Sequence, residues 1–231
     1  MNNRKLMIWL VIVLTCLYII RCSSNRLHEY EFNETTVSAM MVTPPRAQIF
    51  SDFFYPGNEG LIGTAIRIGT GIVKGIQTRE AQKRLDNAMT RVDIPEQMRK
   101  RTLEQSGKYL HFYPVEETEN ADFLMMMKIK KYGIEAQSWD ASVNFKIDME
   151  VKLIDNVKHI EVWGKTINEN TVITTSIFGL GDSVGDVITA SALSQLSEEE
   201  MVNGFTHLAD YTADRVAEKI EDDFIKAHSE E

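Results

Sequence analysis

The most constraining feature of this chain is a run of strict alternation between apolar and polar side chains over residues 143–153. The apolar members are Val143, Phe145, Ile147, Met149, Val151 and Leu153. A period of two places all of them on one face of a β-strand, because successive side chains point to opposite faces. The sequence therefore predicts an antiparallel sheet with one buried face and one face in water.

Neighbouring segments supply partners for this strand. Four further stretches read as strands: residues 36–42, 109–115, 123–132 and 158–167. The turn pair Asp155–Asn156 joins the last of them to the alternating strand. Residues 123–127 are apolar on both faces, which is typical of a strand in mid-sheet or beneath a second layer. We expect a meander of four to five strands.

Helical patterns stand on either side of the strands. Apolar spacing predicts a helix from Thr78, and Asp93 with Pro95 predicts a second one from Ile94 to Gly107. A short helix is expected after residues 182–183, and a capping box at Ser197 opens a long one. The apolar stripe of that long helix is Met201, Phe205, Leu208, Thr212, Val216, Ile220 and Phe224. The expected fold class is α+β, a single domain over residues 37–231 with helices packed on one face of the sheet.

The amino terminus has the form of an export signal. Arg4 and Lys5 precede an apolar run over residues 6–20, followed by Arg21 and Cys22. Fifteen helical residues at about 1.5 Å each are shorter than the ~30 Å hydrocarbon core of a bilayer. We interpret residues 1–21 as a signal peptide that targets the chain.

Cys22 is a candidate lipidation site. The chain has two cysteines, Cys16 inside the apolar run and Cys22 after it, so it has no disulfide framework. Residues 19–22 resemble the cleavage motif of bacterial lipoproteins, with Arg21 where that family has Gly, Ala or Ser. The resemblance implies acylation of Cys22 and a membrane anchor. An uncleaved anchor and a soluble secreted form remain as alternatives.

Charge and composition limit the partners of the mature chain. Removal of residues 1–21 leaves 22 basic and 34 acidic side chains, a formal net charge of −12. Such a balance disfavours nucleic acid and direct adhesion to anionic lipid, so membrane contact should come from acyl chains. Polar residues 22–36 read as a lipidated tether. Ser23, in place of the aspartate that retains some lipoproteins in the inner membrane, favours the outer membrane.

Glycines are dense in residues 57–76. We read this segment as a loop or a close-packed helix. A possible docking or membrane-inserting role falls on Gly63, Gly69, Gly71 and Gly75. Arg67 and Lys74 argue against a membrane span.

Residues with catalytic or metal-binding chemistry are few. The five histidines are His28, His111, His159, His207 and His228. Their spacing matches no metal motif, and we expect no metal, no cofactor and no enzyme activity. Residues 181–185 fit the G-x-S-x-G nucleophile elbow around Ser183, but that motif belongs to a parallel sheet. We interpret Ser183 as part of a helix cap.

A second resemblance covers residues 94–226. Residues 121–124, a strand ending near Gly133, then residues 153–155 and 162–163 follow the order Ala-Asp, strand, strand, Leu-x-Asp, Trp. This order is similar to small α+β domains of bacterial envelope lipoproteins, such as the amino-terminal domain of TolB and the periplasmic domain of the curli secretion lipoprotein CsgG. The resemblance implies a periplasm-facing accessory domain that binds other envelope proteins.

Two functional classes follow from these patterns. The first is a non-catalytic lipoprotein that docks onto another envelope protein. The second is a lipid or small-ligand carrier with an apolar pocket under the sheet. Its lining would be Met125, Met126, Met127 and Met149.

Overall fold

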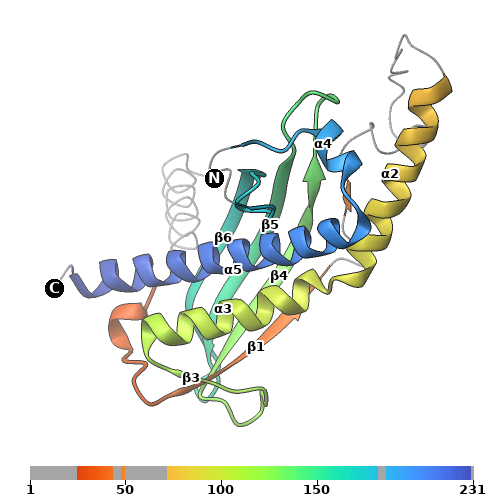
Figure 1. The fold of residues 1–231 in the computed structure, drawn as a ribbon. Coiled ribbons are helices and arrows are strands. Elements are labelled where there is room, and N and C mark those ends of the chain that lie inside the picture. Colours follow the sequence, from red (N-terminus) through yellow and green to blue (C-terminus); the bar gives the residue numbers. More distant parts are fainter. Residues whose placement is uncertain (1–24, 44–47, 50–71, 182–185, 230–231) are drawn as a thin grey trace, which may run out of the picture.

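The computed structural model describes residues 25–43, 48–49, 72–181 and 186–229. In chain order the elements are η1 (Leu27–Glu29), β1 (Thr36–Val42), β2 (Gln48–Ile49), α2 (Ile72–Arg91), α3 (Ile94–Leu110), β3 (Tyr113–Pro114), β4 (Phe123–Glu135), β5 (Asn144–Asp155), β6 (Ile160–Val172), α4 (Ala190–Gln195) and α5 (Glu198–Ser229). Helices α3 and α5 cross one face of a curved sheet (Figure 1). Among the described residues, no helix combines the length and the apolar character that a membrane crossing requires.

The sheet is mixed, with strand order β3-β1-β4-β5-β6 and β2 beside β4. The meander expected from the sequence is confirmed for β4, β5 and β6, which pair antiparallel. Strands β1 and β2, however, pair parallel to β4, and β3 pairs parallel to β1. The reason is the connection: α2 and α3 stand between β1 and β4, and such a crossover returns the chain in the same direction.

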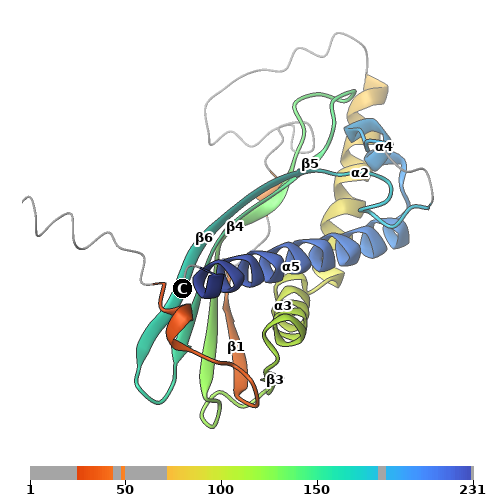
Figure 2. The same cartoon turned by 90° about the vertical axis from the view of Figure 1, so that its left-hand side faces the viewer.

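One face of the sheet is buried beneath the helices. Along β5, every second residue from Phe145 to Asp155 is buried and the residues between them are half-buried, which confirms the predicted alternation. The stripe of α5 is buried from Met201 to Ile220, and Phe224 packs against the core from a half-buried position. All labelled helices lie on the same side of the sheet (Figure 2). Burial of each large apolar side chain in this layer contributes about 1.5–3 kcal/mol.

Capping residues mark the helix starts that the sequence predicts. Asp93 accepts a hydrogen bond from the Glu96 backbone N–H at 3.1 Å, and Pro95 lies in the first turn of α3. At the start of α5, the Ser197 hydroxyl accepts from the Glu200 N–H at 3.2 Å, and a Glu200 carboxylate oxygen accepts from the Ser197 N–H at 2.8 Å. Both predicted caps are confirmed.

The prediction that α3 ends at Gly107 and that residues 109–115 form a strand is wrong. The helix continues to Leu110 and ends at His111, which has the left-handed φ of 62°. Residues 109–110 are therefore helical, and β3 is only Tyr113–Pro114. A glycine inside a helix costs about 1 kcal/mol, less than burial of a leucine contributes. Leu110 is 3% exposed, so its burial keeps the last turn in place.

The short helix α4 begins later than the sequence suggests. Its cap is Thr189, whose hydroxyl accepts from the Ala192 N–H at 3.2 Å. Val187, expected inside this helix, forms a β-bridge with Thr174 instead. The expected cap at residues 182–183 lies outside the described residues.

The loop after β6 is locked onto α5 by a tight aromatic contact. Phe178 is fully buried, and its ring stands edge-on to Phe205 at a centroid distance of 5.7 Å. The same ring lies directly against Gly204, where an added methyl group would overlap it. Gly179, which follows Phe178 in the chain, has a left-handed φ of 71° and lies beside the His207 ring. Glycine at position 204 therefore serves close packing.

Replacement of this glycine provides a test of the contact. We expect Gly204→Ala to lower the free energy of unfolding by about 1–3 kcal/mol through overpacking, although helix propensity alone would raise it by about 1 kcal/mol. The exposed neighbour Asn203→Ala is the control and should change it little. Urea unfolding followed by tryptophan fluorescence measures both. A more stable Gly204→Ala variant would contradict the assignment.

Candidate functional site

The segment that follows the predicted lipidation cysteine is bound to the body. The Arg26 N–H donates to the Val162 carbonyl at the edge of β6, at 2.7 Å. Leu27 is fully buried and Phe32 is 1% exposed. The sequence predicts a polar tether over residues 22–36, whereas in the structure any free part ends at Arg26. The sequence signal for this attachment is the presence of three large side chains that can be buried, Leu27, Tyr30 and Phe32, within the polar stretch.

Aromatic rings hold this segment against two parts of the body, strand β4 and helix α5. Phe32 packs edge-on against Phe123 of β4 at 5.0 Å and lies 5.8 Å from Phe224 of α5. Tyr30 stands edge-on to Phe123 at 5.6 Å. The segment therefore joins the sheet to the last turns of α5.

A buried carboxylate completes the attachment. The Tyr30 hydroxyl donates to Asp155 at 3.1 Å, and the Lys158 ammonium lies 3.0 Å from the same carboxylate. Burial by itself raises the pKa of Asp155, but hydrogen bonds from the Lys158 backbone and ammonium and from Tyr30 outweigh it and hold this pKa below its usual value. Asp155 is therefore an anion that holds the turn and the attached segment together through these contacts.

The sheet face opposite the helices carries an apolar patch, which we call the open face: Met40, Val42, Leu124, Met126 and Ile154. Strand pairing assembles it, because Met40 lies beside Met126, and Leu124 lies beside Ile154. Met40 is 42% exposed and Val42 is 46% exposed, while the other three are half-buried. Figure 2 shows no described helix on this side. Residues 123–127, which are apolar on both faces, lie in mid-sheet because β4 stands between β1 and β5. This is one of the two positions that the sequence predicts.

Lysines border the open face. Lys128 pairs with Glu150 in the ladder, and Lys131 pairs with Asp148. A bulge between Ile129 and Lys131 adds Lys130, whose ammonium is 3.9 Å from Glu150. All three lysines are exposed. In a chain of net charge −9, this border is locally basic.

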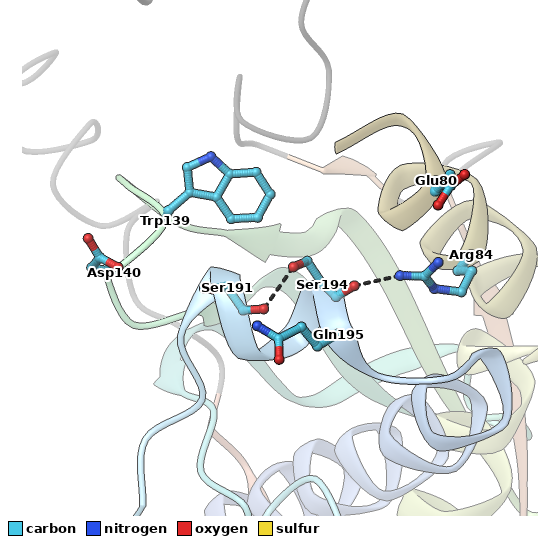
Figure 3. A pocket seen from close by; sticks show the side chains of 7 residues that line it. All are labelled: Glu80, Arg84, Trp139, Asp140, Ser191, Ser194 and Gln195. Carbon is cyan, nitrogen blue, oxygen red and sulfur yellow. Dashed lines mark hydrogen bonds between the residues drawn. The ribbon is translucent and has the colours of Figure 1, made fainter. Parts of the chain in front are cut away.

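A polar hollow lies at the end of the body where α5 begins, and we call it the distal hollow. It has a volume of about 440 Å³, and Figure 3 shows its lining from α2, α4 and the loop between β4 and β5. The lining residues are Glu80, Arg84, Trp139, Asp140, Ser191, Ser194 and Gln195. Arg84 donates to the Ser194 carbonyl at 2.6 Å. The arrangement offers hydroxyl, amide, carboxylate and guanidinium groups beside the Trp139 ring.

Several predicted site residues fall outside the described part. These are Cys22, Gly63, Gly69, Gly71 and Ser183. Gly75 lies within α2, so the end of the glycine-rich segment is helical. The predicted lipidation of Cys22, the docking role of the glycines and the helix-cap role of Ser183 stay predictions.

The methionines proposed as a pocket lining divide between two faces. Met125 and Met127 are each 1% exposed and Met149 is fully buried, so all three belong to the core beneath the helices. Met126 lies on the open face. None of the four lines the distal hollow. Within the described part, these side chains fill space that a ligand would need.

The histidines occupy separate structural positions. His111 and His159 have left-handed φ values of 62° and 57°, so both serve turns. His207 packs beside Gly179, and His228 lies 4.2 Å from the Phe224 ring. Across the described ranges, no cluster of three potential metal ligands occurs.

Comparison with known proteins gives likeness to solved structures only. No protein-family model and no curated protein matches the chain. PelC from Paraburkholderia phytofirmans, crystallised as a dodecamer, is 8% identical, with 80% of this chain and 86% of that chain covered and a TM-score of 0.38. A Xanthomonas campestris protein of family DUF330 is 14% identical, with 83% and 90% covered and a TM-score of 0.33. A lipoprotein candidate from Caulobacter crescentus is 13% identical, with 60% and 86% covered and a TM-score of 0.32.

These likenesses support no functional conclusion, because their identities and TM-scores are low. They do not show the predicted resemblance to TolB and CsgG.

The contribution of Asp155 to the stability of the folded chain depends on pH. Its folded-state pKa is depressed, so its contribution is complete above the unfolded value of about 3.9 and is lost as pH falls through the folded value. We expect Asp155→Asn to lower the free energy of unfolding by about 1–2 kcal/mol at pH 7 and by less in acid. Urea unfolding across pH measures this difference, with the exposed Asp222→Asn as control. A difference that does not change with pH would contradict the assignment.

Proposed function

We propose that this protein is a membrane-anchored envelope lipoprotein, without catalytic activity, that docks onto another envelope protein. The observation that carries the proposal is the open face. A sheet face with Met40 and Val42 more than two-fifths exposed, beside half-buried Leu124, Met126 and Ile154, gains free energy when a partner covers it. Full burial contributes about 1.5–3 kcal/mol for each large side chain, so a partial gain over five amounts to several kcal/mol.

The border of the open face specifies the chemistry of the partner. Exposed Lys128, Lys130 and Lys131 favour a protein that presents a flat apolar surface next to acidic side chains. A uniformly anionic lipid surface is a weaker candidate, because it would also face Asp148 and Glu150, whereas a protein can place its acidic side chains opposite the lysines alone. The partner class is therefore an acidic envelope protein.

The export signal and Cys22 supply the location. Acyl chains at Cys22 would hold the body at the membrane, with about 0.8 kcal/mol per buried methylene. Ser23 after the cysteine supports the outer membrane, with the body in the periplasm. The carrier alternative is less favoured, because Met125, Met127 and Met149 are packed in the core.

The anchor is tested by a Cys22→Ala variant. The wild type should incorporate a palmitate analogue and fractionate with membranes, whereas the variant should do neither, because the acylated thiol is absent. Cys16→Ala is the matched control and should behave like the wild type. Equal labelling and fractionation of the Cys22→Ala variant and the wild type would remove the lipoprotein proposal.

The docking surface is tested by site-specific photo-crosslinking in living cells. A photoreactive phenylalanine at position 40 or 42 should give the same discrete adduct, and one at exposed Lys108 of α3, on the helical side, should not. Met126→Glu should abolish the adduct, because a charge in the patch would be desolvated on docking. Lys128→Glu should weaken it by charge reversal.

Only this pattern of adducts supports docking through the open face. The same adduct from position 108, or an adduct that survives Met126→Glu, would contradict docking through the open face. Folding of each variant is checked by its urea midpoint, so a loss of the adduct cannot be confused with a loss of structure.

A further inference from the structure

The distance between the anchor and the body is short. Three residues lie between Cys22 and Arg26, so four Cα–Cα steps join them, and the Arg26 N–H donates to the Val162 carbonyl at 2.7 Å. Four fully extended steps span at most about 14 Å. An uncleaved anchor that ends near Ile20 leaves only two residues more.

Part of this length lies within the bilayer interface. The hydrocarbon core is ~30 Å thick and the whole bilayer about 40–45 Å, so each headgroup layer takes about 5–7 Å. An acylated Cys22 lies at the inner side of that layer. The backbone of Arg26 is therefore within about 10 Å of the membrane surface.

The point of attachment lies at one end of an elongated body. Helix α5 has 32 residues and spans about 48 Å. Its last turns lie beside η1, and its first turn lies near α4 (Figure 1), whose residues line the distal hollow. We call the end formed by η1, residues 156–159 and the last turn of α5 the anchor end.

Two apolar side chains project from the anchor end without a described cover. Val157, in the turn between β5 and β6, is 77% exposed, the largest exposed fraction among the large apolar side chains of the described part. Ile225, in the last turns of α5, is 55% exposed. The neighbouring Asp155 turn is tied to Tyr30 of the attached segment, so Val157 cannot move away from the anchor independently.

We infer that the anchor end rests on the membrane surface, with Val157 and Ile225 in the headgroup layer and α5 directed away from the bilayer. This inference rests on the proposed membrane anchor and adds the face that meets the lipid. Acidic Glu29, Glu31 and Asp222 near this end are offset by exposed Arg26, Lys158 and Lys226, so we expect little net attraction to anionic lipid. The short tether, aided by two small apolar contacts, determines the orientation.

The orientation is measured by fluorescence quenching on the full-length protein. Single cysteines at Val157, Ile225, Ser138 and Met40 are labelled with bimane, and the protein is reconstituted in vesicles of phosphatidylethanolamine and phosphatidylglycerol with a headgroup-spin-labelled phosphatidylcholine. Ser138 lies in the loop between β4 and β5 at the distal end, and Met40 is on the open face. The parent protein without an added cysteine gives the background from Cys16 and Cys22.

We expect quenching at Val157 and Ile225 to be several-fold stronger than at Ser138 and Met40. Equal quenching at all four positions, or the strongest quenching at Met40, would overturn the inference, and the latter would place the open face on the bilayer. A Gly/Ser linker of about twelve residues inserted before Asn25 adds about 20 Å of reach and should remove most quenching at Val157. Unchanged quenching with the linker would contradict the tether as the cause.

Failure of the anchor and failure of the orientation give different results. If the wild type does not float with the vesicles, the proposed anchor fails and this inference fails with it. If it floats and Ser138 is quenched as strongly as Val157, the anchor stands and the orientation is wrong.

Discussion

The contact between the alternating strand β5 and the apolar stripe of α5 sets the arrangement of the other elements. Because β5 buries only every second side chain, the helices have one face to cover, and α3 and α5 both lie there. On the opposite face, no helix of the described part covers the strands. Ion pairs reinforce the layer where α5 passes over β6: Lys165 lies 2.8 Å from Asp223, which also accepts from the Trp163 indole at 3.1 Å. These polar contacts orient the end of the helix, while the apolar layer supplies most of the stability.

The parts of the fold that could be predicted are those whose signal is local. The alternation of β5, the caps at Asp93 and Ser197 and the stripe of α5 each lie within one segment, and all are confirmed. The parallel pairing of β1 with β4 joins residues more than eighty positions apart, and no turn between them fixes a register. The end of α3 was missed for another reason: local glycine preference lost to burial of Leu110.

The candidate sites show the same division. The docking of Leu27 and Phe32 was missed because isolated apolar residues in a polar stretch give no period, and their partners Phe123 and Phe224 are distant in sequence. The open face was partly visible in residues 123–127, where apolar side chains point to both sides of one strand. What the sequence could not show is that no described helix covers the second side. The distal hollow combines three separate elements and had no sequence signal.

A short attachment also limits which partners the open face can reach. If Arg26 is held within about 10 Å of the membrane and α5 rises about 48 Å from it, each surface has a fixed height above the bilayer. Met40 and Met126 lie on β1 and β4, which begin near the anchor end, whereas α4, which lines the distal hollow, lies at the far end (Figure 1). A partner of the open face must therefore be embedded in the same membrane or lie close to it. In the proposed orientation, a partner of the distal hollow would bind at the end of the body farthest from the membrane, so it would not compete with a partner of the open face.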